Sequence, residues 1–211
     1  MDWTGTIDGY CERTDPAFWS EPVNAATNLA FLVAAIVMWA RTRGMPAGQT
    51  LSALLFLIGV GSGLFHTLAT GWAALADVAA IVLFTLAYLY LANRDFMGWP
   101  IWISGLGTLA FLPYSLVLTR AFETLPFFAI SSFYWPLPLL ILAYSALLLR
   151  SSPVTSRNLA VGAGILCVSL AARSVDELFC AAFPLGTHFV WHLLNAIMLG
   201  WMIETWRRHR S

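Results

Sequence analysis

The stretch GSGLFHTLATGWAALADVAA, from Gly61 to Ala80, places a serine, a histidine and an aspartate in sequence that is otherwise almost continuously apolar. Apolar runs of about 20 residues lie on both sides of it, and a run of that length matches a hydrocarbon core roughly 30 Å thick. Only 10% of the 211 residues are charged, whereas a soluble domain carries roughly 25%. The chain is therefore predicted to be an integral membrane protein, in which intramembrane polar side chains need partners or a function.

Apolar runs between polar breaks predict one all-α domain, residues 1–211, built as a bundle of seven transmembrane helices. The expected spans lie near residues 22–40, 50–69, 73–92, 98–119, 127–149, 157–175 and 187–206. Residues 1–21 are predicted to lie outside the membrane, and they lack the basic region and apolar stretch of a cleavable signal peptide. The formal net charge is zero, so the sequence does not indicate the basic surface of a nucleic-acid-binding protein.

The arginines predict the orientation of this bundle. With the N-terminus outside, only Arg13, Arg120 and Arg173 lie on the outer side. The cytoplasmic side then holds Arg41, Arg43, Arg94, Arg150, Arg157, Arg207, Arg208 and Arg210. This excess follows the positive-inside rule and predicts a cytoplasmic C-terminus. The arginine-only, alanine-rich composition favours a bacterial chain, so we expect a multi-pass protein of the inner membrane with its site toward the periplasm.

Five polar residues from three predicted helices fall at a similar depth in this topology. Ser62 and His66 lie one turn apart near the outer end of the second helix, and Asp77 lies about one turn into the third. His188 and His192 share one face of the seventh helix. Three imidazoles and a water molecule form the open tetrahedral site of a catalytic zinc, so we expect the three histidines to bind Zn²⁺.

Each of these residues also has an ordinary alternative. A single histidine near the membrane surface can snorkel or bridge helices, and Ser62 between two glycines can serve close helix packing. In the functional interpretation, zinc lowers the pKa of a bound water molecule toward about 7. Asp77 then accepts the proton of that water or orients a ligand imidazole, and Ser62 donates a hydrogen bond to the oxyanion.

The pattern Ser62-Gly-Leu-Phe-His66, followed by Asp77 and by His188-Phe-Val-Trp-His192, resembles the signature of the alkaline ceramidases. These enzymes belong to a superfamily of seven-span membrane hydrolases that includes the adiponectin and progestin receptors. The resemblance implies a zinc ion held by the three histidines and catalysis by Asp77 and Ser62. It also implies hydrolysis of the amide bond of ceramide, or of a related N-acyl lipid, to a fatty acid and a sphingoid base or other amine.

Two further segments resemble the ceramidase branch rather than the receptor branch. They are YCERTDPAFWSEPVNAATNLAFL, which begins at Tyr10, and DELFC, which ends at Cys180. Cys11 and Cys180 both fall outside in the predicted topology, where disulfides persist, and the family pattern suggests the same pair. We expect them to be bonded, two free thiols being the alternative, and we expect Cys167 to pack as a small apolar residue.

The resemblance also implies a calcium ion near the N-terminal segment. The oxygen donors available there are Asp8, Glu12, Asp15, Glu21 and Asn24, and a hard cation takes six to eight such ligands. The spacing departs from the family pattern, because Asp8 precedes Glu12 by four residues rather than three and Ala17 stands where a ligand glutamate is expected. Glu21 is the replacement from the next turn, and a merely solvated acidic segment is the alternative.

Other functions stay open at this point. The same zinc can serve a receptor-like or signalling seven-span protein, and the polar cluster can belong to a transporter or a structural protein. For an amidase, the scissile amide is expected near the headgroup boundary with the acyl chain inside the bundle. Four aromatic residues are candidates for lining an acyl groove or for anchoring at the interface, namely Trp72, Phe128, Tyr134 and Trp135.

Overall fold

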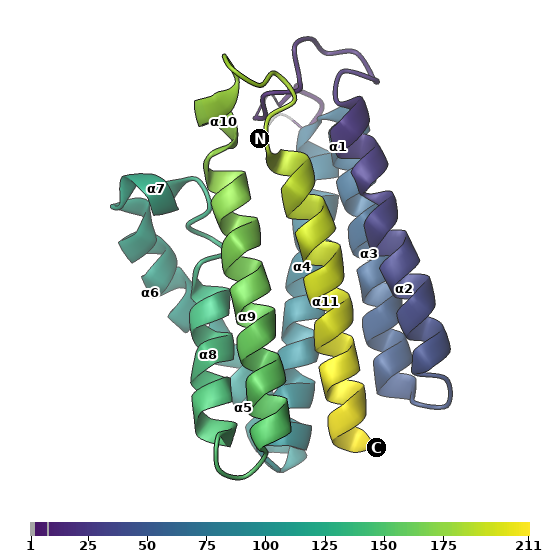
Figure 1. The fold of residues 1–211 in the computed structure, drawn as a ribbon, viewed down its shortest axis with the longest axis vertical. Helices are drawn as coiled ribbons and strands as arrows, with labels where there is room; N and C mark the ends of the chain where they lie inside the picture. The colour runs from purple at the N-terminus through teal and green to yellow at the C-terminus, as the bar shows by residue number, and fades with distance from the viewer. Residues whose placement is uncertain (1–2, 8) are drawn as a thin grey trace.

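The structure is a computed structural model, and it describes residues 3–7 and 9–211. Within those residues the regular elements are helices, together with one isolated β-bridge between Thr6 and Thr70. In chain order they are α1 (Pro22–Thr27), α2 (Leu29–Arg41), α3 (Pro46–Leu68), α4 (Gly71–Leu91), the π-helix η1 (Ala92–Phe96), α5 (Ile101–Leu109), α6 (Phe111–Glu123), α7 (Pro126–Ala129), α8 (Pro136–Leu148), α9 (Pro153–Ser174), α10 (Asp176–Phe179) and α11 (His188–Arg210). The long helices stand side by side, with α10 and the N-terminal segment at one end and the C-terminus at the other (Figure 1).

Five helical segments are long and apolar enough to cross a membrane, which confirms the prediction of a helical membrane bundle at that level. They are Pro22–Arg41, Pro46–Leu68, Gly71–Phe96, Ile101–Glu123 and Pro153–Ser174. The expected fifth span at 127–149 is represented by α7, a turn and the short apolar helix Pro136–Leu148. The expected seventh span coincides with α11, which is long enough but carries more polar side chains than the other five. The count of seven spans stays a prediction.

Proline and lipid-compatible side chains explain the helices locally. α1, α3, α8 and α9 each begin with a proline in the first turn, where its missing N–H costs no hydrogen bond. The outward faces carry exposed apolar residues, such as Val33 and Ile36 on α2 and Leu116 and Val117 on α6. Exposed apolar surface of this extent indicates contact with lipid rather than water.

α3 and α4 approach each other closely beside the polar stretch. A Cβ atom on Gly61 would lie 3.0 Å from the carbonyl oxygen of Ala76 and 3.1 Å from the Cα atom of Asp77. Only glycine fits this distance without a backbone shift. The glycine therefore brings Asp77 against the turn of α3 that carries Ser62 and His66.

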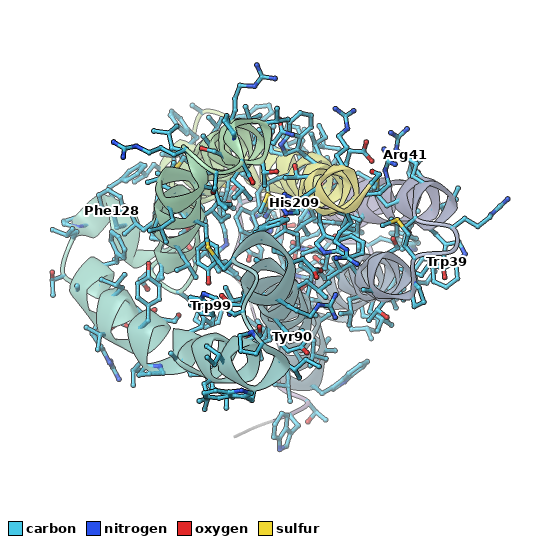
Figure 2. The ribbon with its side chains drawn as sticks, turned by 90° about the horizontal axis from the view of Figure 1, so that it is seen from below. Trp39, Arg41, Tyr90, Trp99, Phe128 and His209 are labelled. Atoms are coloured by element: carbon cyan, nitrogen blue, oxygen red, sulfur yellow. A yellow bond between two sulfur atoms is a disulfide. The ribbon has the colours of Figure 1, made fainter. Side chains whose placement is uncertain are left out.

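Arginines gather at the end of the bundle that holds the C-terminus. Glu204 on α11 pairs with Arg41, Arg207 and Arg208 at 2.8, 2.8 and 2.7 Å. Figure 2 looks at this end, where His209 lies near the middle of the bundle and Arg41 lies at its edge. The orientation of this end toward the cytoplasm stays a prediction.

Candidate metal centre

Three buried imidazoles meet at the end of the bundle opposite the C-terminus. His66 lies in the last turn of α3, His188 opens α11, and His192 follows one turn later. Their side chains are 1–2% exposed, and their ring centroids lie 4.6 to 5.0 Å apart. One ring nitrogen from each lies within 4.8 Å of the other two, a grouping that suits a metal ion.

Hydrogen bonds define which nitrogens of two of these rings are protonated. His66 Nδ1 lies 2.6 Å from Glu21 Oε2. Burial raises the pKa of the Glu21 carboxyl, but hydrogen bonds from His66, Arg13 and Asn24 outweigh that effect and hold the pKa below its ordinary value. The carboxylate therefore accepts, and His66 Nδ1–H donates. His192 Nδ1 lies 2.9 Å from the hydroxyl of Thr27, which uses its own hydrogen on a backbone carbonyl of α1, so this Nδ1–H donates as well.

The remaining nitrogens of these two rings face each other. His66 Nε2 and His192 Nε2 lie 3.1 Å apart, and in the neutral rings both carry lone pairs because both Nδ1 atoms hold the hydrogen. Two lone pairs at this distance repel unless a cation or a proton lies between them. Two nitrogens bound to one tetrahedral zinc lie about 3.3 to 3.4 Å apart, given Zn–N bonds of roughly 2.0 to 2.1 Å. The pair therefore fits a metal with little adjustment.

The third imidazole is held by Asp176 and Tyr10. Asp176 Oδ1 accepts the backbone N–H groups of Thr187 and His188 at 2.5 and 2.8 Å, and so caps the start of α11. The ring of His188 stacks on Tyr10 with centroids 3.6 Å apart. Its buried Nδ1 has no hydrogen-bond partner among the described residues. This unsatisfied nitrogen is a second sign that the cluster is built for a metal ion.

Asp77 and Ser62 lie beside the histidine cluster. Both line a cavity together with His188, Arg173 and Asn195, which is called the site cavity below. Asp77 Oδ1 is buried and has no hydrogen-bond partner among the described residues. A buried acceptor without a partner is suited to receive a proton or a hydrogen bond from a bound molecule.

A second, apolar cavity adjoins the first. Its wall includes Tyr88, Phe96, Tyr144 and Leu159. The two cavities share six lining residues, namely Phe84, Thr85, Leu137, Leu166, Met198 and Leu199. Among the four aromatic residues predicted for an acyl groove, Tyr134 lines the site cavity, whereas Trp72 is exposed and Phe128 and Trp135 pack against each other with centroids 4.8 Å apart.

Most of the predicted calcium ligands that the structure describes are engaged by the chain itself, whereas the buried side-chain oxygen of Asn24 has no hydrogen-bond partner among the described residues. Glu12 accepts the backbone N–H groups of Val23 and Asn24 at 2.7 and 2.8 Å. Asp15 Oδ1 accepts the N–H group of Ala17 at 2.8 Å. Asn24 donates its side-chain amide to Glu21 at 3.1 Å. Asp8 lies outside the described residues.

A guanidinium lies among these oxygens instead. The side chain of Arg13 is 1% exposed, and its Nε lies 2.5 Å from Glu21 Oε1. Its terminal nitrogens donate to the carbonyl oxygens of Asp15, Ala17 and His66 at 3.2, 3.3 and 3.2 Å. This buried side chain supplies positive charge to the acidic segment, which disfavours a divalent ion at the same oxygens.

The disulfide between Cys11 and Cys180 is confirmed, with the two Cα atoms 5.1 Å apart, and Cys167 is the free cysteine. The backbone N–H of Cys11 also donates to Asp176 Oδ2 at 3.0 Å. Gly186 makes this contact possible, because its φ of 62° suits glycine and a Cβ atom there would lie 2.8 Å from that of Cys11. The bond therefore fastens the N-terminal segment to the start of α11.

Sequence reasoning identified the three histidines, Asp77 and Ser62, and the structure brings all five to one end of the bundle. It assigned Glu21 to calcium, and it overlooked Thr27 and Asp176 as supports of the imidazoles and Arg173 as a wall of the site cavity. For Arg173 a signal was available, because an ionisable residue within a membrane span is functional by default, whereas Thr27 and Asp176 offered no such signal. No protein-family model matches the chain, and no curated protein sequence matches it either.

Proposed function

We propose that this chain is a zinc-dependent membrane amidase that hydrolyses ceramide or a related N-acyl lipid to a fatty acid and a free amine. The observation that carries the proposal is the pair of Nε2 lone pairs facing each other at 3.1 Å, with the third imidazole beside them. The sequence resemblance to alkaline ceramidases supports the same assignment. Seven spans, an extracytoplasmic N-terminus and a site on the periplasmic side of a bacterial inner membrane belong to this proposal.

The proposed roles follow from the chemistry of each group. His66, His188 and His192 hold Zn²⁺, which when bound supplies Lewis-acid activation of water and of the amide carbonyl. Asp77 takes a proton from the attacking water and returns it to the departing amine nitrogen. Ser62 donates a hydrogen bond to the oxygen that gains negative charge. Water thus gives its oxygen to the acyl carbon, and the C–N bond breaks.

The adjoining cavities support a lipid substrate. The apolar cavity offers its wall to an acyl chain, whereas the polar side chains lie in the site cavity next to it. The amide of a lipid whose chain occupies the apolar cavity therefore lies beside Asp77 and Ser62. This division of polar and apolar lining favours an amidase over the receptor-like or transporter alternatives, which need no aligned acyl and amide sites.

The test combines metal analysis with hydrolysis. Purified protein is expected to hold one zinc ion per chain and to release labelled fatty acid from a panel of N-acyl lipids that includes ceramide. His66→Ala is expected to lose the zinc and the activity, whereas Asp77→Asn is expected to keep the zinc and lose the activity. His209→Gln is the matched control, because this histidine lies at the other end of the bundle, bonded to Thr155.

The outcomes separate the alternatives. A chain without stoichiometric zinc contradicts the metal assignment. A zinc-loaded chain that cleaves no N-acyl lipid contradicts the amidase and returns the receptor-like alternative. Activity that survives in Asp77→Asn contradicts only the role of Asp77 in proton transfer.

A further inference from the structure

A guanidinium lines the site cavity, and the proposed hydrolysis does not use it. Arg173, in the last turn of α9, shares this wall with Asp77 and His188. It lies over the rings of Tyr10, Tyr134 and Trp191, with its central carbon 5.9, 5.4 and 5.8 Å from their centroids. The aromatic faces hold the cation in place without neutralising it.

The hydrogen-bond partners of Arg173 are also uncharged. Its Nη1 donates to the carbonyl oxygen of Ile130 at 2.7 Å and to the hydroxyl of Ser131 at 3.1 Å. Its Nη2 donates to the Tyr10 hydroxyl at 3.4 Å. A tyrosine hydroxyl is neutral near pH 7 and offers no counter-charge.

No carboxylate of the described residues lies within 4.0 Å of this guanidinium, whereas Arg13, Arg41 and Arg94 each have one at 2.5 to 2.8 Å. The Asp77 carboxyl lines the same cavity and interacts electrostatically with Arg173, but it forms no ion pair with it, so an anion that arrives with a ligand can pair with the guanidinium directly. A guanidinium also matches a carboxylate or phosphate group in planar, two-pronged geometry. The site cavity therefore holds an unpaired guanidinium that a ligand anion can reach, in addition to the Asp77 carboxyl.

The charge lies on the amine side of the expected substrate. α9 runs from the end of the bundle that holds the C-terminus to the end that holds α10 (Figure 1), so Leu159 in the apolar cavity and Arg173 lie toward opposite ends of it. With the acyl chain among the apolar residues and the amide at Asp77 and Ser62, the group bonded to the amide nitrogen points toward Arg173.

We propose that Arg173 selects N-acyl lipids that carry an anionic group, a carboxylate or a phosphate, next to the amide nitrogen, with N-acyl amino acids as the simplest members. This inference rests on the proposed amidase function and narrows its substrate class. Neutral ceramide is then a poorer substrate than an acidic N-acyl lipid of equal chain length.

Two matched substrate pairs test the selection. N-lauroylglycine is compared with N-lauroylglycinamide, and N-lauroyl-phosphoethanolamine with N-lauroylethanolamine, so that each pair differs in the anionic group and shows which anion is preferred. We expect kcat/KM to be at least about tenfold higher for the anionic member of one pair, a ratio typical of a charged hydrogen bond. Arg173→Gln is expected to remove the preference chiefly by raising KM for the anionic substrate, with less than about threefold change for the neutral one. Arg173→Lys is expected to retain part of the preference for the anionic substrate.

A control variant and a binding measurement complete the test. Arg120→Gln removes an exposed arginine that pairs with Glu123, and it is expected to leave the preference unchanged. Equilibrium binding of each pair to Asp77→Asn protein, with and without Arg173→Gln, measures recognition without hydrolysis. Equal binding of the anionic and neutral members, or equal loss of both in Arg173→Gln, overturns the inference. Absence of all hydrolysis with anion-selective binding retained contradicts the amidase and supports the anion site.

Discussion

A buried ion pair lies directly behind one of the three imidazoles. Arg13 fixes one oxygen of Glu21 at 2.5 Å, and the other oxygen accepts Nδ1–H of His66 at 2.6 Å. A carboxylate behind a ligand imidazole fixes its tautomer and makes its free nitrogen a better donor to a metal. Arg13 also bonds the His66 carbonyl oxygen at 3.2 Å, so the same side chain holds the backbone and the ring.

Glu21→Gln is therefore expected to lower the zinc affinity by about 10- to 100-fold. The amide oxygen can still accept from His66, but it brings no negative charge and leaves Arg13 buried without a counter-ion. Competition with a chromophoric chelator measures the change. Glu123→Gln is the control, because its carboxylate belongs to an exposed pair 3.1 Å from Arg120. Equal affinities for Glu21→Gln and wild type would contradict the role.

Calcium is expected to have no effect on this protein. Because Arg13 pairs with Glu21 and both carboxylate oxygens of Glu12 accept backbone N–H groups, adding CaCl₂ to protein purified without it should leave the melting temperature and the zinc content unchanged. Arg13→Gln is expected to lower the melting temperature, and added calcium is not expected to restore it. A rise in melting temperature of the wild-type protein with calcium, but not with magnesium, contradicts this prediction.

Residue type alone indicated the metal ligands, because histidines are rare in apolar helices and a histidine there has few roles other than a functional one. The residues that hold those ligands in place could not be predicted from residue type. Thr27 and Asp176 contact His192 and His188 across 165 and 12 residues, and such pairings depend on how helices and loops pack. Sequence spacing limits which side chains share a helix face, but it does not specify contacts between distant segments.

At the scale of helices, the close contact between α3 and α4 depends on one glycine. Gly61→Ala would place a methyl group 3.0 Å from a backbone carbonyl oxygen of α4, and overpacking of this kind costs about 1 to 3 kcal/mol. Gly63→Ala is the matched control, because the nearest atom to its added carbon lies 3.9 Å away. Equilibrium unfolding in mixed micelles compares the unfolding free energies of the two variants. Equal values would show that α3 and α4 can move apart at no energetic cost. Hydrolysis is expected to fall in Gly61→Ala alone, since the shift displaces Asp77.

Hydrophobicity located the helices well but missed their breaks. The expected span at 127–149 is interrupted, because residues 130–135 form turns and α8 begins only at Pro136. The expected span at 98–119 is divided at Ala110 into α5 and α6. Both segments are predominantly apolar, so mean hydropathy does not mark the breaks. Proline lacks an N–H group and fixes where a helix can start, which is the local cause at Pro136.

At the scale of the whole chain, the disulfide joins segments 169 residues apart in sequence. Loss of such a bond costs about 2 to 4 kcal/mol, and here it also frees Tyr10 and Arg13 from the histidine cluster. Cys11→Ser with Cys180→Ser is expected to lower both the unfolding free energy and the zinc affinity. Reductant should produce the same change in the wild type and none in the double variant, and Cys167→Ala should respond to reductant as the wild type does. A reduced wild-type protein with undiminished zinc affinity would contradict the link.

The orientation of the molecule in its membrane is the remaining global prediction, and two exposed loop positions test it. The excess of arginine at the end with the C-terminus predicts that this end faces the cytoplasm.

In a Cys167→Ala background, Thr124→Cys marks the loop after α6, and Ser151→Cys marks the loop before α9. A membrane-impermeant maleimide is expected to label Thr124→Cys in cells whose inner membrane is intact, and Ser151→Cys only after lysis. The reverse pattern would place the histidine cluster on the cytoplasmic side, where the Cys11–Cys180 bond would be reduced. Because the disulfide and the arginine distribution are independent features of the chain, their agreement on one orientation makes this labelling result a joint test of both.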